Sequence, residues 1–109
     1  MDYIQNHLEN TVRRTSSSTD AKESVILGVM GISGESGELT DYFKKVLFQG
    51  HELNRDRVIE ELGDIFWYMQ YLMDTLNIDF EEVLRMNSIK LNMRYPEGFT
   101  VEESINREV

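Results

Sequence analysis

Two pairs of acidic residues stand out in the sequence because they share one spacing. Glu35 and Glu38 enclose Ser-Gly, Glu61 and Asp64 enclose Leu-Gly, and residues 39–60 separate the two pairs. Side chains three positions apart on an α-helix lie on the same side, about one turn apart. Two such helices facing each other would bring four carboxylates together, and their charges are tolerable only with protons or a divalent cation. The pattern therefore predicts a metal site formed by these four residues.

The donor atoms indicate which metal to expect. A site built from carboxylate oxygens suits Mg²⁺, with Mn²⁺ as a substitute, rather than zinc or copper. The chain has no cysteine, and its two histidines, His7 near the start and His51 in an expected turn, are interpreted as surface residues. Magnesium held by several acids commonly binds phosphate oxygens and activates water. The acids thus indicate phosphate chemistry.

The acids also have a structural interpretation, because the macrodipole favours acidic residues early in a helix. One Glu-x-x-Asp pair taken alone is more often structural than functional. Here both pairs border an apolar stripe and both enclose a glycine, Gly37 in the first pair and Gly63 in the second. That repetition favours the metal site.

Four glycines, Gly28, Gly31, Gly34 and Gly37, recur every third residue through the first acidic pair. Each costs a helix about 1 kcal/mol relative to alanine. The series therefore indicates close backbone packing, a bend or the approach of a ligand, and the spacing does not choose between them. A phosphate-binding P-loop is excluded, because no Gly-Lys-Ser/Thr sequence follows.

The apolar spacing is helical up to Pro96, the only proline, and this predicts an all-α chain. Asp20, Asn54 and Asp79 are expected helix caps, and Gly50 is the expected stop of the second helix. The expected helices cover about residues 3–14, 21–48, 55–77 and 80–94, and a short last turn begins at Thr100, with Glu103 completing its cap.

The expected third helix is apolar on nearly every side. Between Ile65 and Met73, Gln70 is the only plainly polar residue. A helix that is apolar all round must be covered all round, and three other short helices offer too little surface. We therefore expect a second copy of the chain to complete the bundle, as a homodimer or homotetramer. The alternatives are an unusually well-buried central helix and a substrate pocket lined by aromatic residues.

Positive side chains are expected around a phosphate site. Lys45, beside Lys44, lies near the end of the expected second helix, and Asn87, Lys90 and Arg94 lie three and four positions apart on the fourth. This spacing puts the last three on one face. The alternative is a solvated basic edge, since positive residues are also favourable near the C-terminus of a helix.

Length, charge and hydropathy narrow the classes of protein. With 109 residues, there is room for one domain, 1–109, whose core is expected at about 20–95. The 20 acidic and 11 basic side chains give a net charge of -9, which disfavours a nucleic-acid polymer but not a single nucleotide. No apolar run approaches the roughly 18–20 residues that span a bilayer, and the start lacks a signal-peptide pattern. We therefore expect a cytoplasmic protein without a membrane partner.

Three motifs in order resemble the MazG-like all-α nucleoside triphosphate pyrophosphohydrolases. They are Gly-Glu-Ser-Gly-Glu-Leu at 34–39, Glu-Glu-Leu-Gly-Asp-Ile at 60–65, and Asn87, Lys90 and Arg94 followed by Tyr-Pro. The resemblance covers about residues 22–107. It implies a four-to-five-helix bundle completed by homo-oligomerisation. It also implies cleavage of nucleoside triphosphates between the α and β phosphates to the monophosphate and pyrophosphate, with nucleotide-pool cleaning as the purpose.

The resemblance also implies roles for particular residues. Glu35, Glu38, Glu61 and Asp64 would hold Mg²⁺, which binds the triphosphate and the attacking water, and we choose Glu38 as the general base. The implied substrate contacts are Asn87, Lys90 and Arg94, together with Tyr68, one turn after Asp64.

Two rival functions remain. In a non-catalytic helical interaction module, the acids would form a solvated face and the aromatic helix would bind a partner. Loss of the metal response in folded Glu38→Gln and Asp64→Asn variants would exclude that module. The second rival, an enzyme of the same fold that acts on another pyrophosphate compound, is separated only by a panel of substrates.

Overall fold

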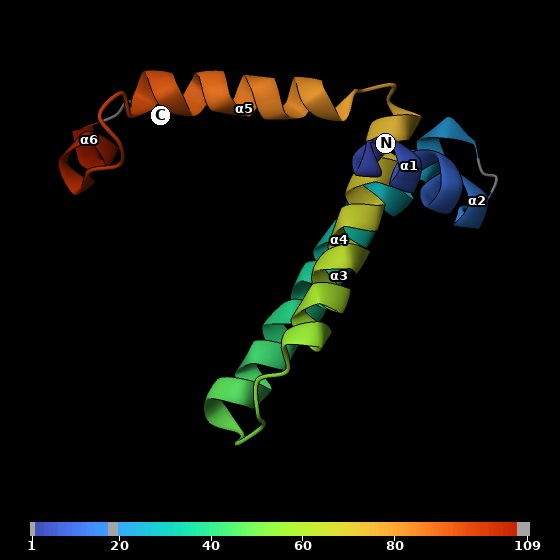
Figure 1. Ribbon diagram of the computed structural model, residues 1–109, viewed down its shortest axis with the longest axis horizontal. Helices are drawn as coiled ribbons and strands as arrows, with labels where there is room; N and C mark the ends of the chain where they lie inside the picture. Colours follow the sequence, from blue (N-terminus) through green and yellow to red (C-terminus); the bar gives the residue numbers. More distant parts are fainter. Residues whose placement is uncertain (1, 18–19, 107–109) are drawn as a thin grey trace. The chain divides into compact units, whose positions relative to one another are not determined.

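Every element that the structure describes is a helix. The computed structural model describes residues 2–17 and 20–106 (Figure 1), and these residues contain no strand. The predicted all-α class is therefore confirmed. In chain order, the elements are α1 (Tyr3–His7), the π-helical turn η1 (Leu8–Val12), α2 (Arg13–Thr15), α3 (Ala21–Phe48), α4 (Arg55–Thr75), α5 (Phe80–Arg94) and α6 (Val101–Asn106).

The predicted caps bound the long helices. The side chains of Asp20 and Asn54 accept hydrogen bonds from backbone amides in the first turns of α3 and α4. Asp79 forms a reciprocal capping box with Glu82 at the start of α5. Gly50 follows α3 with a φ of 73°, a left-handed conformation that glycine adopts at little cost. The boundaries of these helices therefore follow from local capping chemistry.

The chain divides into two compact units, Met1–Asn77 and Ile78–Val109. In the first unit, α3 and α4 run side by side in opposite directions as a long hairpin, with α1, η1 and α2 packed near one end of it (Figure 1). The second unit contains α5 and α6. Within the described residues, no helix combines the length and the apolar character needed to cross a membrane.

Two of the four regularly spaced glycines allow α3 and α4 to approach closely. A Cβ at Gly28 would lie 2.9 Å from the Cβ of Leu72, and one at Gly31 would lie 2.1 Å from Cδ1 of Tyr68. Larger side chains at these positions would push the helices apart. Around Gly34 and Gly37, by contrast, a Cβ would meet nothing within 4 Å. Packing therefore explains the first two glycines but not the last two.

The N-terminal helical segment is attached to α4 by polar contacts. Arg13 makes a bidentate ion pair with Asp74, at 2.8 and 3.2 Å. Gln70, which is only 3% exposed, donates a hydrogen bond to the carbonyl of Ile4 at 3.2 Å and also contacts His7. The N-terminal segment of the same chain therefore covers Gln70, the one polar residue in the apolar run of α4. The sequence did not reveal this contact.

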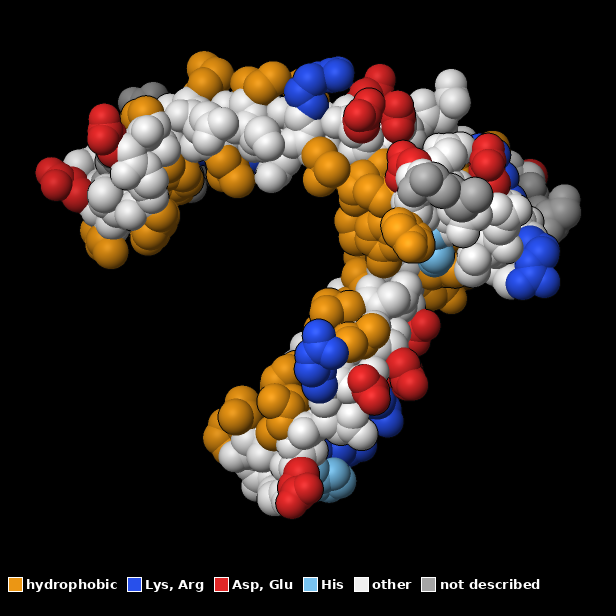
Figure 2. All heavy atoms as spheres, viewed as in Figure 1, with side chains coloured by type: hydrophobic (Ala, Val, Ile, Leu, Met, Phe, Trp, Pro, Cys, Tyr) orange, Lys and Arg blue, Asp and Glu red, His pale blue; other side chains and the backbone are white. Residues whose placement is uncertain are grey.

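Much apolar surface of the hairpin stays uncovered (Figure 2). Among the described residues, the buried apolar side chains are those of Val12, Tyr71 and Met73. Val29 and Met30 of α3 are more than half exposed. Contiguous exposed apolar surface is typical of an interface, so the expected homo-oligomer remains a prediction with this support.

The second unit contains the short helix α6 where the sequence predicted a last turn. Thr100 directly precedes α6, and its carbonyl accepts a hydrogen bond from the amide of Ser104 at 3.1 Å. The rings of Tyr95 and Phe99 lie 5.4 Å apart in the turn between α5 and α6. The side chain of Glu103, the expected cap partner, lies outside the described residues.

Candidate metal centre

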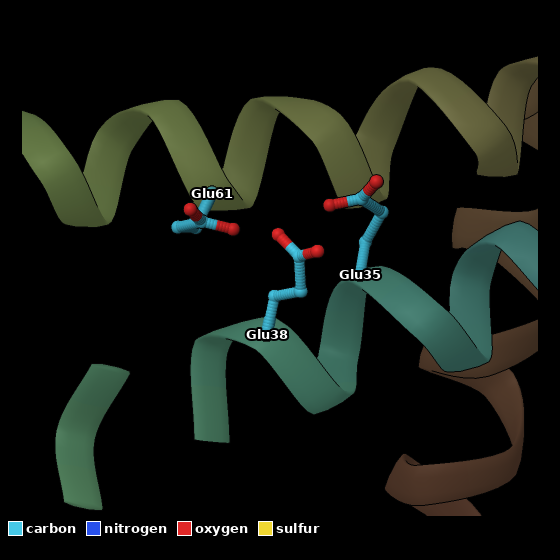
Figure 3. A group of neighbouring side chains, drawn as sticks. All are labelled: Glu35, Glu38 and Glu61. Carbon is cyan, nitrogen blue, oxygen red and sulfur yellow. The ribbon is translucent and has the colours of Figure 1, made fainter. Parts of the chain in front are cut away.

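Three of the four predicted acids meet between α3 and α4. Glu35 and Glu38 project from α3, and Glu61 projects from α4, toward the same space (Figure 3). One carboxylate oxygen from each residue lies within 4.8 Å of the others, an arrangement that could hold a metal ion. Asp64 does not belong to this group, but it lies near enough for its charge to act on Glu35.

Glu61 is the most buried of the predicted ligands, with 5% of its surface exposed. Its Oε1 accepts a hydrogen bond from Nε of Arg57, one turn earlier on α4, at 3.0 Å. Its Oε2 and the Oε2 of Glu35 are buried and have no hydrogen-bond partner among the described residues. Buried carboxylate oxygens without partners are costly, and carboxylate oxygens are the donors that Mg²⁺ and Mn²⁺ prefer. The residues present therefore fit a metal of this class.

The charges of the cluster act on one another. The pKa of Glu35 is raised above its ordinary value, mainly by burial and then by the negative charges of Glu38, Asp64 and Glu61. Both causes disfavour the ionised carboxylate. A divalent cation at this place would remove that penalty, because it neutralises the charges that produce it.

The rotation of α4 explains why an acid is buried here. Tyr68 and Leu72 lie seven and eleven positions after Glu61, so all three share one face of the helix. The close contacts of Tyr68 and Leu72 with the glycines of α3 turn this face toward α3. As a result Glu61 is buried, whereas the neighbouring Leu62 is 51% exposed. A buried acid beside an exposed leucine is informative, because hydrophobicity favours the reverse.

A polar cavity of about 380 Å³ lies next to the acidic cluster and shares Glu38 with it. This volume is within the range of about 300–1,000 Å³ that is common for ligand pockets. The lining includes three residues that can carry positive charge. The full lining consists of Glu38, Asp41, Tyr42, Lys45, His51 and Arg57.

The loop between α3 and α4 forms one wall of this cavity. The Tyr42 hydroxyl accepts a hydrogen bond from the amide of Asn54 at 2.7 Å, which fixes the end of the loop to α3. The amide of His51 donates to the carbonyl of Lys45 at 3.2 Å, just after the left-handed Gly50. These contacts bring residues before and after the loop to the same place.

The comparisons with known proteins agree with this geometry. A family model described as the MazG nucleotide pyrophosphohydrolase domain matches residues 25–99. The chain belongs to the MazG family. It is also 33% identical over 92 residues to the gene 37 protein of Mycobacterium phage L5, a match that covers 81% of each chain. No solved structure matched. The matched MazG region contains all of the acids in the cluster.

Other residues predicted to contact the substrate lie in different environments in this MazG domain. Lys45 lines the cavity and forms an ion pair with Asp41 at 3.2 Å. The ring of Tyr68 packs on the backbone of Gly31, a structural contact that its spacing did not predict. The remaining three, Asn87, Lys90 and Arg94, lie on α5 in the second unit, and their contact with substrate stays a prediction.

Arg57 and His51 are cavity residues that the sequence interpretation did not assign to the MazG site. Arg57 precedes Glu61 by four positions, and this spacing alone could have suggested an ion pair on α4. His51 is exposed, as predicted for a turn residue, and also lines the cavity. Its position depends on how the loop folds, for which the sequence offers no simple signal.

Proposed function

We propose that this chain is a Mg²⁺-dependent nucleoside triphosphate pyrophosphohydrolase. It would convert a canonical or modified nucleoside triphosphate to the monophosphate and pyrophosphate, and so clean the nucleotide pool of the cytoplasm. The observation that carries the proposal is the buried Oε2 of Glu61, which lies in a cluster with Glu35 and Glu38 and has no partner among the described residues. The match to the pyrophosphohydrolase domain supports the class of reaction.

Glu35, Glu38 and Glu61 would hold the metal, and Asp64 would complete the acidic set from the next turn of α4. When bound, Mg²⁺ neutralises charge on phosphate oxygens and lowers the pKa of water. Mn²⁺ is expected to substitute for it, because both ions accept carboxylate oxygens as ligands.

Glu38 is the residue that we assign as the general base. It is the exposed member of the cluster and also lines the cavity, so a water molecule can reach it. Water attacks the α-phosphorus and forms a new P–O bond, while the bond from the α-phosphorus to the α–β bridging oxygen breaks. Pyrophosphate leaves with the bridging oxygen, and Glu38 takes the proton from the water.

The remaining site residues bind substrate in this proposal. Lys45 would contact phosphate, which is supported by its place in the cavity beside Glu38. Asn87, Lys90 and Arg94 share one face of α5 and would also contact the nucleotide, as would Tyr68. A homodimer or homotetramer would cover the exposed apolar side chains of the hairpin.

Pyrophosphate release from a panel of canonical and damaged nucleoside triphosphates, with Mg²⁺ and with EDTA, tests the proposal. Release by the wild type should require Mg²⁺, and Glu38→Gln should lower it about a hundredfold or more. Glu60→Gln is the matched control, because Glu60 is exposed on α4 and lies outside the cluster. A folded, metal-binding protein that releases nothing would act on another pyrophosphate compound. A protein that binds no metal would fit the interaction module instead.

A further inference from the structure

Arg57 connects the acidic cluster with the polar cavity. Its Nε donates a hydrogen bond to Oε1 of Glu61 at 3.0 Å. Its guanidinium carbon lies 5.5 Å from the ring centre of Tyr42, and both residues line the cavity. The two ends of this ion pair differ in burial: 52% of the Arg57 side chain is exposed, against 7% for Glu61. The carboxylate is therefore fixed, whereas the guanidinium has room to move.

We propose that Arg57 is an exchangeable counter-ion, which neutralises Glu61 in the metal-free protein and turns to the pyrophosphate end of the substrate when a divalent cation takes over Glu61. The cavity shared with Lys45 and His51 would then be the subsite for that end. This inference rests on the proposed function and deepens it. It assigns to Arg57 a role that changes with the occupancy of the metal site.

The contact between Arg57 and Glu61 is suited to exchange. In the described part of the chain, the structure shows one hydrogen bond between them, within a pair four residues apart on one helix. A pair of this spacing on one helix is weak when one partner is half exposed, as Arg57 is. A divalent cation on Glu61 repels the guanidinium, because like charges a few ångströms apart repel each other at a protein surface. Arg57 then favours another anion.

The cavity can provide that anion site. Lys45 and Arg57 contribute two permanent positive charges, and His51 adds a ring that can donate a hydrogen bond. Asp41 and Glu38 also line the cavity. The ion pairs of Asp41 with Lys44 and Lys45, both at 3.2 Å, hold its pKa below the ordinary value and supply its counter-charge, and the metal would neutralise Glu38. A guanidinium matches phosphate oxygens with two parallel hydrogen bonds.

One consequence is that metal and pyrophosphate bind cooperatively. When the metal binds alone, it must displace Arg57 from Glu61, and this displacement lowers the affinity for the metal. Pyrophosphate gives the displaced guanidinium a new partner, so each ligand raises the affinity for the other.

The experiment measures binding without turnover. Mn²⁺ is titrated into metal-free protein by isothermal calorimetry, and inorganic pyrophosphate is then titrated into the Mn²⁺-loaded protein, for the wild type, Arg57→Gln and Arg55→Gln. Arg55 is the matched control, because it lies exposed in the same first turn of α4 and does not line the cavity. We expect Arg57→Gln to bind Mn²⁺ alone about three- to tenfold more tightly and pyrophosphate about tenfold or more weakly. Arg55→Gln should change neither.

A second variant keeps the test decisive if Arg57→Gln does not fold. Arg57→Lys keeps the positive charge beside Glu61 but loses the planar fork of the guanidinium. It should bind Mn²⁺ like the wild type and pyrophosphate about threefold or more weakly. Adenosine monophosphate, used in place of pyrophosphate, should bind equally to all the variants.

The possible results separate this inference from the proposed function. Weaker Mn²⁺ binding by Arg57→Gln would mean that Arg57 orients Glu61 for the metal, and unchanged pyrophosphate binding would mean that the cavity is not the subsite; either overturns the inference. If the opposed shifts occur but the wild type cleaves no triphosphate, the inference stands and the proposed function fails. If the wild type cleaves triphosphate with metal but the opposed shifts are absent, the proposed function stands and the inference fails.

Discussion

The ring of Tyr68 on α4 lies on the backbone of Gly31 on α3, so closely that a Cβ at Gly31 would come within 2.1 Å of the ring. Glu35 lies one turn beyond this contact on α3, and Glu61 lies about two turns before it on α4. The contact therefore sets the separation of the two helices where their carboxylates meet. The candidate metal centre depends on a glycine that contributes no ligand.

Gly31→Ala should destabilise the protein and weaken its metal site. The added methyl group would force Tyr68 or the whole helix to move, and such overpacking costs about 1–3 kcal/mol. Chemical denaturation should show this loss in the free energy of unfolding, and a Mn²⁺ titration should show a lower affinity.

Gly34→Ala is the control for this substitution. It lies one turn further along α3, and its Cβ would meet nothing within 4 Å. Because alanine favours a helix more than glycine does, the free energy of unfolding of this variant should be higher by up to about 1 kcal/mol. If both variants changed stability in the same direction and by the same amount, the contact with Tyr68 would not set the helix separation.

The raised pKa of Glu35 predicts a pH dependence of the metal-free protein. Folding disfavours the ionised carboxylate, so the folded state binds a proton at a higher pH than the unfolded state does. The free energy of unfolding should therefore increase as the pH falls through the raised pKa toward the ordinary pKa of a glutamate, and this contribution is lost as the pH rises through the raised pKa. Glu35→Gln should be the more stable protein at neutral pH.

The quantity to measure is the difference in melting temperature between the wild type and Glu35→Gln at each pH. Other carboxylates largely cancel in this difference, including Asp41, whose lowered pKa acts with the opposite sign. The difference should be largest above the raised pKa of Glu35 and shrink as the pH falls toward the ordinary pKa of a glutamate. A difference that is constant with pH would contradict the assignment of the raised pKa to Glu35.

Glu61→Gln should remove most of the response to metal. The substitution keeps the shape of the side chain but deletes the charge of the most buried member of the cluster. We expect the affinity for Mn²⁺ to fall at least about tenfold and the rise in melting temperature with Mg²⁺ to disappear. Glu60→Gln, the exposed neighbour, should respond to metal like the wild type. Equal responses of the two variants would place the metal elsewhere.

The exposed apolar surface of α3 predicts self-association. Size-exclusion chromatography with light scattering should find a homodimer or homotetramer at micromolar concentration. Met30→Glu, which puts a charge on an exposed apolar position, should shift the population toward smaller species while leaving the helical content unchanged. A wild-type protein that is monomeric under these conditions would contradict the prediction.

Local signals in the sequence were sufficient to predict the helices and part of the candidate metal site. Asp20, Asn54 and Asp79 act through backbone amides within their own first turns, so their effect does not depend on the rest of the fold. The spacing of the two acidic pairs placed Glu35 and Glu38 on one side of α3, and the structure brings them to Glu61.

The features that the sequence did not reveal depend on contacts between distant residues. Gln70 appears as a polar interruption of an apolar helix, but the N-terminal segment covers it. The distinction between the packing glycines and the open ones requires knowing which residues of α4 face them. The cavity depends on the contact of Tyr42 with Asn54 across the loop, which no periodic pattern encodes.

In the proposed reaction, the cluster of Glu35, Glu38 and Glu61 directs water to the α-phosphorus of a nucleoside triphosphate. Hydrolysis in water enriched in oxygen-18, followed by mass spectrometry of both products, shows which phosphorus the water attacks. We expect the label in the nucleoside monophosphate, only with Mg²⁺ or Mn²⁺ present, and about a hundredfold less labelled product, or lower still, from Glu38→Gln. Label in pyrophosphate would mean that water attacks a different phosphorus, and equal turnover by Glu38→Gln would mean that Glu38 is not the base; either result would overturn the proposed reaction.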